Sequence, residues 1–133
     1  MYLLDTNICI YIMKDKYPAL TQKILSLNPS DLLISSVTVY ELEYGAEKSN
    51  RIEETRQKLA MFLAPFTIIP FNADDAVVAG KIRGFLEKKG MPIGPYDVQI
   101  AAQGLSRGLT IITHNTKEFS RVPAVNLEDW VEI

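Results

Sequence analysis

The sequence predicts an α/β domain with a mainly parallel sheet of four to five strands and helices on both faces. Short apolar, β-branched runs alternate with helical segments along the chain, which is the order expected of repeated βαβ units. The run LTIIT at 109–113 is almost continuously apolar or β-branched, as in a strand that is covered on both faces. A length of 133 residues suits one domain, so residues 1–133 are expected to form a single unit.

The first half of the chain predicts two strands, each followed by a helix. A strand at 2–4 ends at Asp5, and Thr6 and Asn7 are predicted to cap the apolar helix 8–13. The remaining elements of this half are a helix from Pro18 to about Leu27, a strand at 32–34, a helix from about Thr38 to Lys48 with Glu41 in its first turn, and a helix beginning at Asn50.

The second half continues the alternation. The predicted elements are a strand at 66–71, a long helix that ends near Lys89, a helix that leads into the strand at 109–113, and a weak edge strand at 122–127. Asn72 and Asp75 form a capping pattern ahead of the long helix.

The helix before residues 109–113 has recognisable ends. Pro95 suits the first helical position, Gly94 can precede it as the cap, and Asp97 then falls in the first turn. Gly108 is a suitable C-terminal stop, and Gly104 would allow the helix to approach the sheet closely.

Composition excludes several classes of protein. A single cysteine, Cys9, cannot form an internal disulfide, and it is predicted to be a small core residue. Without a Cys/His cluster, a structural zinc site is not expected. The N-terminus has no basic region and no long apolar stretch, so neither a signal peptide nor a membrane span is predicted and a cytoplasmic location is expected. The net charge of −2 argues against a generic basic nucleic-acid binder.

Four acids are expected at one edge of the sheet, because the βα junctions of a parallel sheet emerge together. They are Asp5 after the first strand, Glu41 after the second, Asp97 at the start of the helix before the fourth strand, and Glu118 after the fourth strand. Each also has a structural explanation. Asp5 could cap a helix, Asp97 could complement a helix dipole, and Glu41 and Glu118 could form capping boxes with Thr38 and Asn115.

Convergence of these carboxylates would favour a bound cation. Two like charges about 4 Å apart repel by about 4 kcal/mol at an effective dielectric constant near 20, so the cluster requires compensation. Oxygen ligands of this kind select Mg²⁺ or Mn²⁺, and a cation of this kind supports hydrolysis of phosphodiesters. The lone histidine, His114, is expected at the surface rather than in catalysis.

The chain resembles PIN-domain ribonucleases of the VapC type, the toxin half of bacterial toxin–antitoxin pairs. Four stretches in order carry the resemblance: LLDTNICIYIM at 3–13, ISSVTVYELEYGAEKS at 34–49, GPYDVQIAA at 94–102, and TIITHNTKEFSRVP at 110–123. The resemblance implies a PIN-like three-layer α/β/α fold and an endoribonuclease that depends on Mg²⁺ or Mn²⁺.

The resemblance also assigns residues and partners. The implied core acids are Asp5, Glu41 and Asp97, the implied hydroxyl neighbours are Thr6 and Thr113, and the fourth position falls to Glu118 with Asn115 as a polar ligand or water holder. The implied partners are a VapB-type antitoxin and a second copy of the chain, which would pack through helices near 37–48 and 73–89, with higher hetero-oligomers possible. The implied substrate is tRNA, in particular the anticodon loop of initiator tRNA.

Other functions remain open at this point. The same metal chemistry would serve a structure-specific DNA nuclease, because hydrolysis does not require a 2′-hydroxyl. A non-catalytic RNA-binding module would keep the acids only as helix caps. A small-molecule phosphatase is disfavoured, since the chain has no convincing phosphate-binding glycine-rich loop or activated nucleophile.

Overall fold

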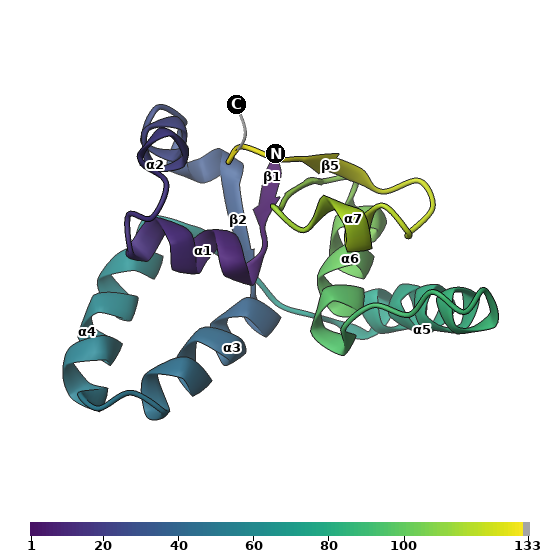
Figure 1. Cartoon of the computed structure of the whole chain (residues 1–133), viewed down its shortest axis with the longest axis horizontal. Coiled ribbons are helices and arrows are strands. Elements are labelled where there is room, and N and C mark those ends of the chain that lie inside the picture. The colour runs from purple at the N-terminus through teal and green to yellow at the C-terminus, as the bar shows by residue number, and fades with distance from the viewer. Residues whose placement is uncertain (132–133) are drawn as a thin grey trace.

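A computed structural model describes residues 1–131 and contains one five-stranded sheet in the order β3-β2-β1-β4-β5 (Figure 1). Every neighbouring pair is parallel, which confirms the predicted sheet. The strands are β1 Tyr2–Leu4, β2 Leu32–Ser35, β3 Thr67–Ile69, β4 Thr110–Ile112 and β5 Asn126–Glu128.

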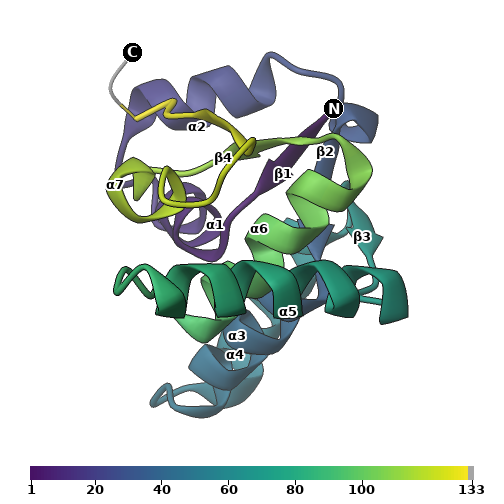
Figure 2. The same ribbon diagram turned by 90° about the vertical axis from the view of Figure 1, so that its right-hand side faces the viewer.

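Seven α-helices and one short 3₁₀-helix connect the strands within residues 1–131. They are α1 Thr6–Met13, α2 Pro18–Leu25, η1 Pro29–Asp31, α3 Ser36–Glu47, α4 Ile52–Leu63, α5 Ala73–Lys88, α6 Pro95–Arg107 and α7 Thr116–Phe119. Helices α5 and α6 cross on one side of the sheet, as Figure 2 shows, and α1 to α4 lie on the other. Helices therefore cover both faces, as the sequence predicted.

The strands divide their side chains between two buried clusters. Leu3 packs with α5, α6 and α7, whereas its neighbour Leu4 packs with α1 to α4. The same alternation separates Ile111 from Ile112 on β4. Cys9 is fully buried in the second cluster, as expected for a small core residue.

Gly104 and Gly108 shape the helix that leads into β4. Gly108 ends α6 in the left-handed conformation, with φ of 65°, as predicted. A Cβ atom at Gly104 would lie 2.6 Å from Ile111 Cδ1, so only glycine permits this closeness between α6 and β4. The backbone thus fixes where α6 lies, and with it the position of Asp97 in its first turn.

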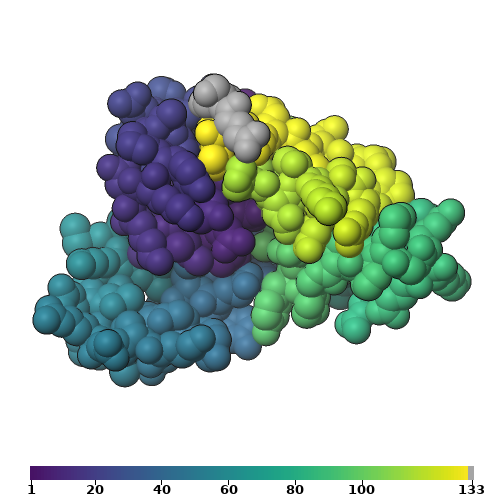
Figure 3. All heavy atoms as spheres, viewed as in Figure 1, coloured from purple at the N-terminus to yellow at the C-terminus, as the bar shows by residue number. Residues whose placement is uncertain are grey.

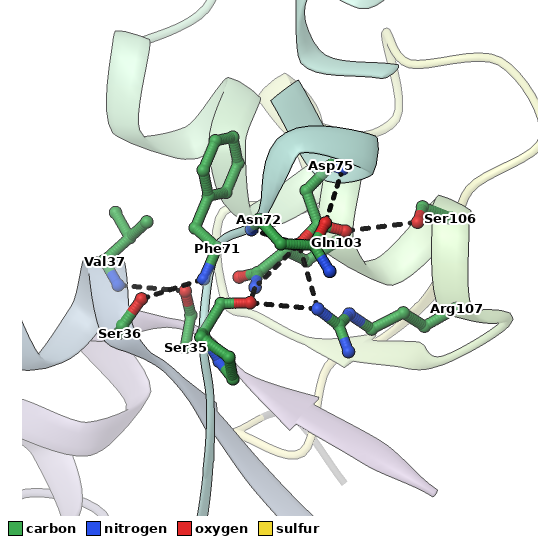
Figure 4. A network of polar contacts seen from close by, with 10 residues as sticks. Ser35, Ser36, Val37, Phe71, Asn72, Asp75, Gln103, Ser106 and Arg107 are labelled. Carbon is green, nitrogen blue, oxygen red and sulfur yellow. Dashed lines mark hydrogen bonds and ion pairs between the residues drawn. The ribbon is translucent and has the colours of Figure 1, made fainter. Parts of the chain in front are cut away.

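A buried polar network fastens the start of α5 to the end of α6 (Figure 4). Asn72 and Asp75 form the predicted capping box at the start of α5. The Arg107 Nη2 atom donates to Asp75 Oδ2 at 2.9 Å and also to the Pro70 carbonyl oxygen at 2.9 Å. Ser106 Oγ donates to the other carboxylate oxygen of Asp75 at 3.2 Å. These contacts hold α5 and α6 in one orientation on the sheet.

Three predicted helix starts are wrong. The helix predicted from Asn50 begins at Ile52, with Arg51 as its cap. Asp5 rather than Thr6 or Asn7 caps α1, because its Oδ1 atom accepts the Ile8 amide at 2.8 Å. Helix α3 begins at Ser36 with Ser35 as its cap, two residues earlier than predicted, so Glu41 lies in the second turn. The capping box of Thr38 and Glu41 therefore does not form.

No helix within residues 1–131 combines the length and apolar character needed to cross a bilayer.

Candidate active site

Asp5 lies at the carboxyl end of β1 and is almost fully buried. Its amide donates to the Ile112 carbonyl at 3.1 Å, which extends the pairing of β1 with β4 by one residue. Its carboxylate caps α1, and 3% of the residue is exposed. The local sequence thus directs a carboxylate to the edge where the strands end.

Glu41 is held by a threonine from a different element. The Thr6 hydroxyl donates to Glu41 Oε1 at 2.7 Å and lies 3.0 Å from the hydroxyl of Thr38, which is itself fully buried. This contact joins the first turn of α1 to the second turn of α3. Glu41 therefore lies beside the first turn of α1, although it stands one turn further along its helix than the sequence predicted.

Thr38 is a site neighbour that sequence reasoning treated only as a cap. With α3 starting at Ser36, Thr38 is its third residue and turns its hydroxyl to Thr6. The earlier start of α3 could have been predicted from the pair Ser35–Ser36, because either serine can cap a helix that begins before Thr38.

Asp97 occupies the first turn of α6, as predicted. Its Oδ2 atom lies 3.4 Å from where a Cβ atom of Gly94 would stand, so the carboxylate is folded back over the start of its own helix. Figure 1 shows the first turns of α1, α3 and α6 near the same edge of the sheet, where the strands end, although α6 covers the opposite face from α1 and α3.

The loop from β4 to α7 brings the remaining predicted residues. Thr113 is fully buried, and its hydroxyl accepts the Asn115 amide at 3.0 Å. The Asn115 side chain donates to Glu118 Oε2 at 3.1 Å. Asn115 makes no side-chain cap to the backbone of α7, so the predicted capping box is wrong and the amide instead holds the carboxylate.

The four carboxylates affect one another electrostatically. Burial raises the pKa of Asp5 to about 6; hydrogen bonds from Thr113 and Ile8 oppose the rise, while the charges of Asp97 and Glu41 add to it. Burial also raises the pKa of Asp97 to about 6, with further contributions from Glu118 and Glu41. Asp97 thus interacts with each of the other three acids.

The acids are gathered but do not form a closed metal cage. Within residues 1–131, no group of three His, Cys, Asp or Glu side chains is close enough to hold a metal ion. The donor set nevertheless fits a hard divalent cation, because its oxygen ligands repel one another and a bound cation would relieve that repulsion.

His114 is half-buried, whereas the sequence predicted a surface position. Its Nδ1 atom lies 2.9 Å from Asp129 Oδ2, and its ring packs near Tyr11 and Tyr17. Because Asp129 is 15 residues away, no local pattern could have indicated this pairing.

Comparison with known proteins assigns this chain to a family. A family model for the PIN domain matches residues 2–125, and the chain belongs to the PIN-domain family. The fold and the resemblance predicted from the sequence are both confirmed.

Full-length relatives carry the VapC name. The tRNA(fMet)-specific endonuclease VapC of Shigella flexneri is 43% identical over 129 residues, which cover 97% of each chain. The Ribonuclease VapC2 of Rickettsia felis is 39% identical over 132 residues, which cover 98% of each. The first is an endonuclease by name and the second a ribonuclease, and this chain is a PIN-domain nuclease like them.

A solved structure agrees along the whole fold. The DNA-bound VapBC complex of Salmonella typhimurium contains a chain with a TM-score of 0.91 and 40% sequence identity, and the match covers 97% of both chains.

Proposed function

We propose that this protein is the endoribonuclease toxin of a toxin–antitoxin pair and that it cleaves tRNA, with initiator tRNA as its foremost substrate. The observation that supports this most is the mutual influence of the Asp5, Asp97, Glu41 and Glu118 carboxylates at one edge of a PIN-domain sheet. The substrate is proposed from the relatives that are named tRNA(fMet)-specific endonucleases. Residues 1–133 are proposed to act as one domain.

Asp5, Asp97, Glu41 and Glu118 are proposed to hold Mg²⁺ or Mn²⁺. When bound, the cation would make water more acidic and neutralise charge that builds on the phosphate. The chain's own hydrogen bonds prepare the two glutamates for this task. Thr6 engages one oxygen of Glu41 and Asn115 engages one oxygen of Glu118, so each carboxylate keeps a second oxygen for a ligand.

Thr113 is proposed to orient Asp5. Its hydroxyl bonds the buried carboxylate and favours the charged form against the effect of burial. A charged Asp5 at neutral pH is the form that can bind a cation.

The first experiment is cleavage of a tRNA pool with Mg²⁺ or Mn²⁺, with EDTA, and with the Asp97→Asn variant, followed by mapping of the fragment ends. Discrete fragments that require both the metal and Asp97 would support the proposal. Asp74→Asn, an exposed aspartate in the first turn of α5, is the matched control and is expected to cleave like wild type. Wild-type rates in EDTA or in Asp97→Asn would refute the mechanism.

A matched DNA stem-loop tests the alternative of a DNA nuclease. We expect cleavage of the RNA and not of the DNA, since one relative is named a tRNA(fMet)-specific endonuclease and another a ribonuclease. A non-catalytic module would show neither cleavage nor binding of a divalent cation.

We propose that a VapB-type antitoxin binds the groove between α1, α3 and α4. The complexes of the structural neighbours are named VapBC, which supports such a partner. Figure 3 shows a hollow between α1 and the arm formed by α3 and α4. The groove measures about 430 Å³, and its lining combines apolar side chains with Lys14, Lys58 and Glu41. An apolar segment seated there would reach the catalytic edge.

Gly45 offers a test of this groove, because it lines the groove and a Cβ atom there meets nothing within 4 Å. Gly45→Leu would place a side chain in the groove and is expected to weaken binding of the coexpressed antitoxin while RNA cleavage persists. Gly84→Leu on α5, where a Cβ atom also meets nothing, is the control. Equal antitoxin affinity of the two variants would place the partner elsewhere.

A homodimer through α3 and α5 is also proposed, with assembly into a larger complex when the antitoxin is present. The exposed apolar side chain of Val77 on α5 supports it. Sedimentation of Val77→Glu tests it: we expect a shift from dimer to monomer, and an unchanged dimer would exclude this contact.

A further inference from the structure

Two exposed tyrosines stand directly before two of the candidate catalytic acids. Tyr40 precedes Glu41 on α3, and Tyr96 precedes Asp97 on α6. Their relative exposures are 56% and 37%. The functional assignment of the acids leaves both rings without a role.

The two rings form one rigid unit although they are 56 residues apart in sequence. Their centroids lie 5.5 Å apart at an interplanar angle of 85°, so the edge of one ring meets the face of the other. The Tyr96 hydroxyl donates to the Tyr40 hydroxyl at 3.1 Å. This arrangement fixes both rings and leaves aromatic surface open to solvent.

Tyr44 extends this surface along α3. It lies one helical turn after Tyr40, on the same face of the helix, and 58% of it is exposed. The Lys48 ammonium stands 5.0 Å from its ring centroid. A cation that can meet a phosphate therefore borders the aromatic surface.

Because the protein is slightly acidic, contacts that do not depend on charge are important for its binding of RNA. The chain has a net charge of −2, and its carboxylates gather at the site that the RNA backbone must approach. Attraction to phosphates alone is therefore weak at this edge. Stacking of an unpaired base on an aromatic ring supplies affinity without a charge, and every base has a face that can stack.

We propose that Tyr40 and Tyr96, extended by Tyr44, form a stacking platform for an unpaired base of the RNA next to the bond that is cleaved. This inference rests on the proposed nuclease function and adds the substrate contact that the acids lack. It restricts substrates to single-stranded segments such as loops, because a paired base cannot present its face to a side chain.

The test compares Tyr40→Leu/Tyr96→Leu with Tyr40→Phe/Tyr96→Phe, using cleavage kinetics and the fluorescence anisotropy of a labelled single-stranded RNA. Loss of both rings is expected to raise KM and the dissociation constant about 5- to 100-fold, with kcat near wild type. The Phe variant keeps both rings and is expected to stay close to wild type. The loss should be the same at low and at physiological salt, since stacking involves no ion release.

Phe85→Leu is the matched control. Phe85 is 40% exposed and lies under the Lys89 ammonium at 5.6 Å, an aromatic and cationic pair on α5 rather than beside Asp97. We expect no change in KM from its loss. Thermal unfolding of every variant verifies that it folds, and sedimentation reports its oligomeric state.

Several outcomes would overturn the platform. Unchanged KM in the Leu variant, with wild-type cleavage intact, would remove the platform and leave the nuclease function standing. A shift from dimer to monomer in that variant would assign the tyrosines to a contact between copies. If wild type fails to cleave RNA, the proposed nuclease function is refuted. The anisotropy then tests the platform separately. The platform is excluded if wild type binds no RNA, or if wild type and the Leu variant bind RNA equally well.

Discussion

Asp5 has two opposing effects on the stability of the fold. The carboxylate caps α1, which stabilises the fold, but its charged form is poorly solvated there. The charged form of Asp5 is therefore disfavoured in the fold, and the proposed cation would offset this cost.

The pH dependence of stability follows from the raised pKa of Asp5. A carboxyl group whose folded-state pKa is raised from 3.8 to about 6 contributes its full stability below pH 4, and the contribution is lost as pH rises through 6. In EDTA, Asp5→Asn keeps an oxygen for the Ile8 amide and should be more stable than wild type at pH 7, by on the order of 3 kcal/mol. Urea unfolding followed by Trp130 fluorescence between pH 4 and 7 measures this.

The matched control for Asp5→Asn is Asp31→Asn, at an exposed position in η1. We expect that substitution to leave the wild-type pH slope unchanged. An Asp5→Asn protein with the same slope as wild type would contradict the assignment of the slope to Asp5.

The close contact between α6 and β4 depends on Gly104, which has no side chain. Gly104→Ala would place a Cβ atom 2.6 Å from Cδ1 and Cγ1 of Ile111, which is fully buried and cannot move into solvent. Overpacking of this kind typically costs about 1–3 kcal/mol, which outweighs the gain in helix propensity of up to about 1 kcal/mol. Chemical denaturation should show net destabilisation, and Ile111→Val should relieve part of it.

Gly84→Ala on α5 gives the comparison, because nothing lies within 4 Å of its Cβ position. The same change is expected to stabilise the protein there by roughly 0.5–1 kcal/mol. Equal effects at both glycines would show that helix propensity alone governs them.

The junction of α5 and α6 depends on a buried ion pair. Burial tends to raise the pKa of Asp75, yet the Asn72 amide and Arg107 lower it overall. Arg107→Met would leave the Asp75 charge buried without its partner and is expected to destabilise the fold by about 3 kcal/mol at pH 7. Because the Asp75 pKa is lowered in the fold, this contribution is present above pH 3.8 and is lost as pH falls below it.

Unfolding of Arg107→Met and wild type at neutral and at acidic pH tests the pairing. The difference between them should shrink toward pH 3. Arg83→Met, which removes an exposed pair with Glu87 on α5, should change stability by less than about 1 kcal/mol. A comparable loss of stability at both arginines would mean that the buried pair of Arg107 with Asp75 contributes no more than an exposed pair.

For the molecule as a whole, the proposed binding of a cation by the four acids would be linked to folding. Mg²⁺ or Mn²⁺ should raise the unfolding temperature of wild type, since a ligand that binds only the folded state at one hundred times its dissociation constant adds about 2.7 kcal/mol. Asp97→Asn should show a much smaller rise, because Asp97 interacts with all three other acids. Differential scanning calorimetry measures this without reference to catalysis.

An equal rise for wild type and Asp97→Asn would place the cation elsewhere on the molecule. Asp74→Asn controls for a general effect of lost charge, and its rise should match that of wild type.

Local sequence determined the elements and most of their ends. Apolar runs marked the strands, and Pro95, Gly108 and the Asn72–Asp75 pair marked where α5 and α6 begin or end. Each of these signals acts through backbone geometry within a few residues, so it can be read without knowing the fold. The acids were found because parallel strands end at a shared edge.

Tertiary structure decided which side chains meet. Glu41 accepts a hydrogen bond from Thr6, 35 residues away, and Tyr96 meets Tyr40 from another helix. The closeness of α6 to β4 and the pairing of His114 with Asp129 likewise depend on packing between distant segments. The distances between such residues are set by how whole helices pack on the sheet. A periodic pattern within one helix or strand carries no information about them.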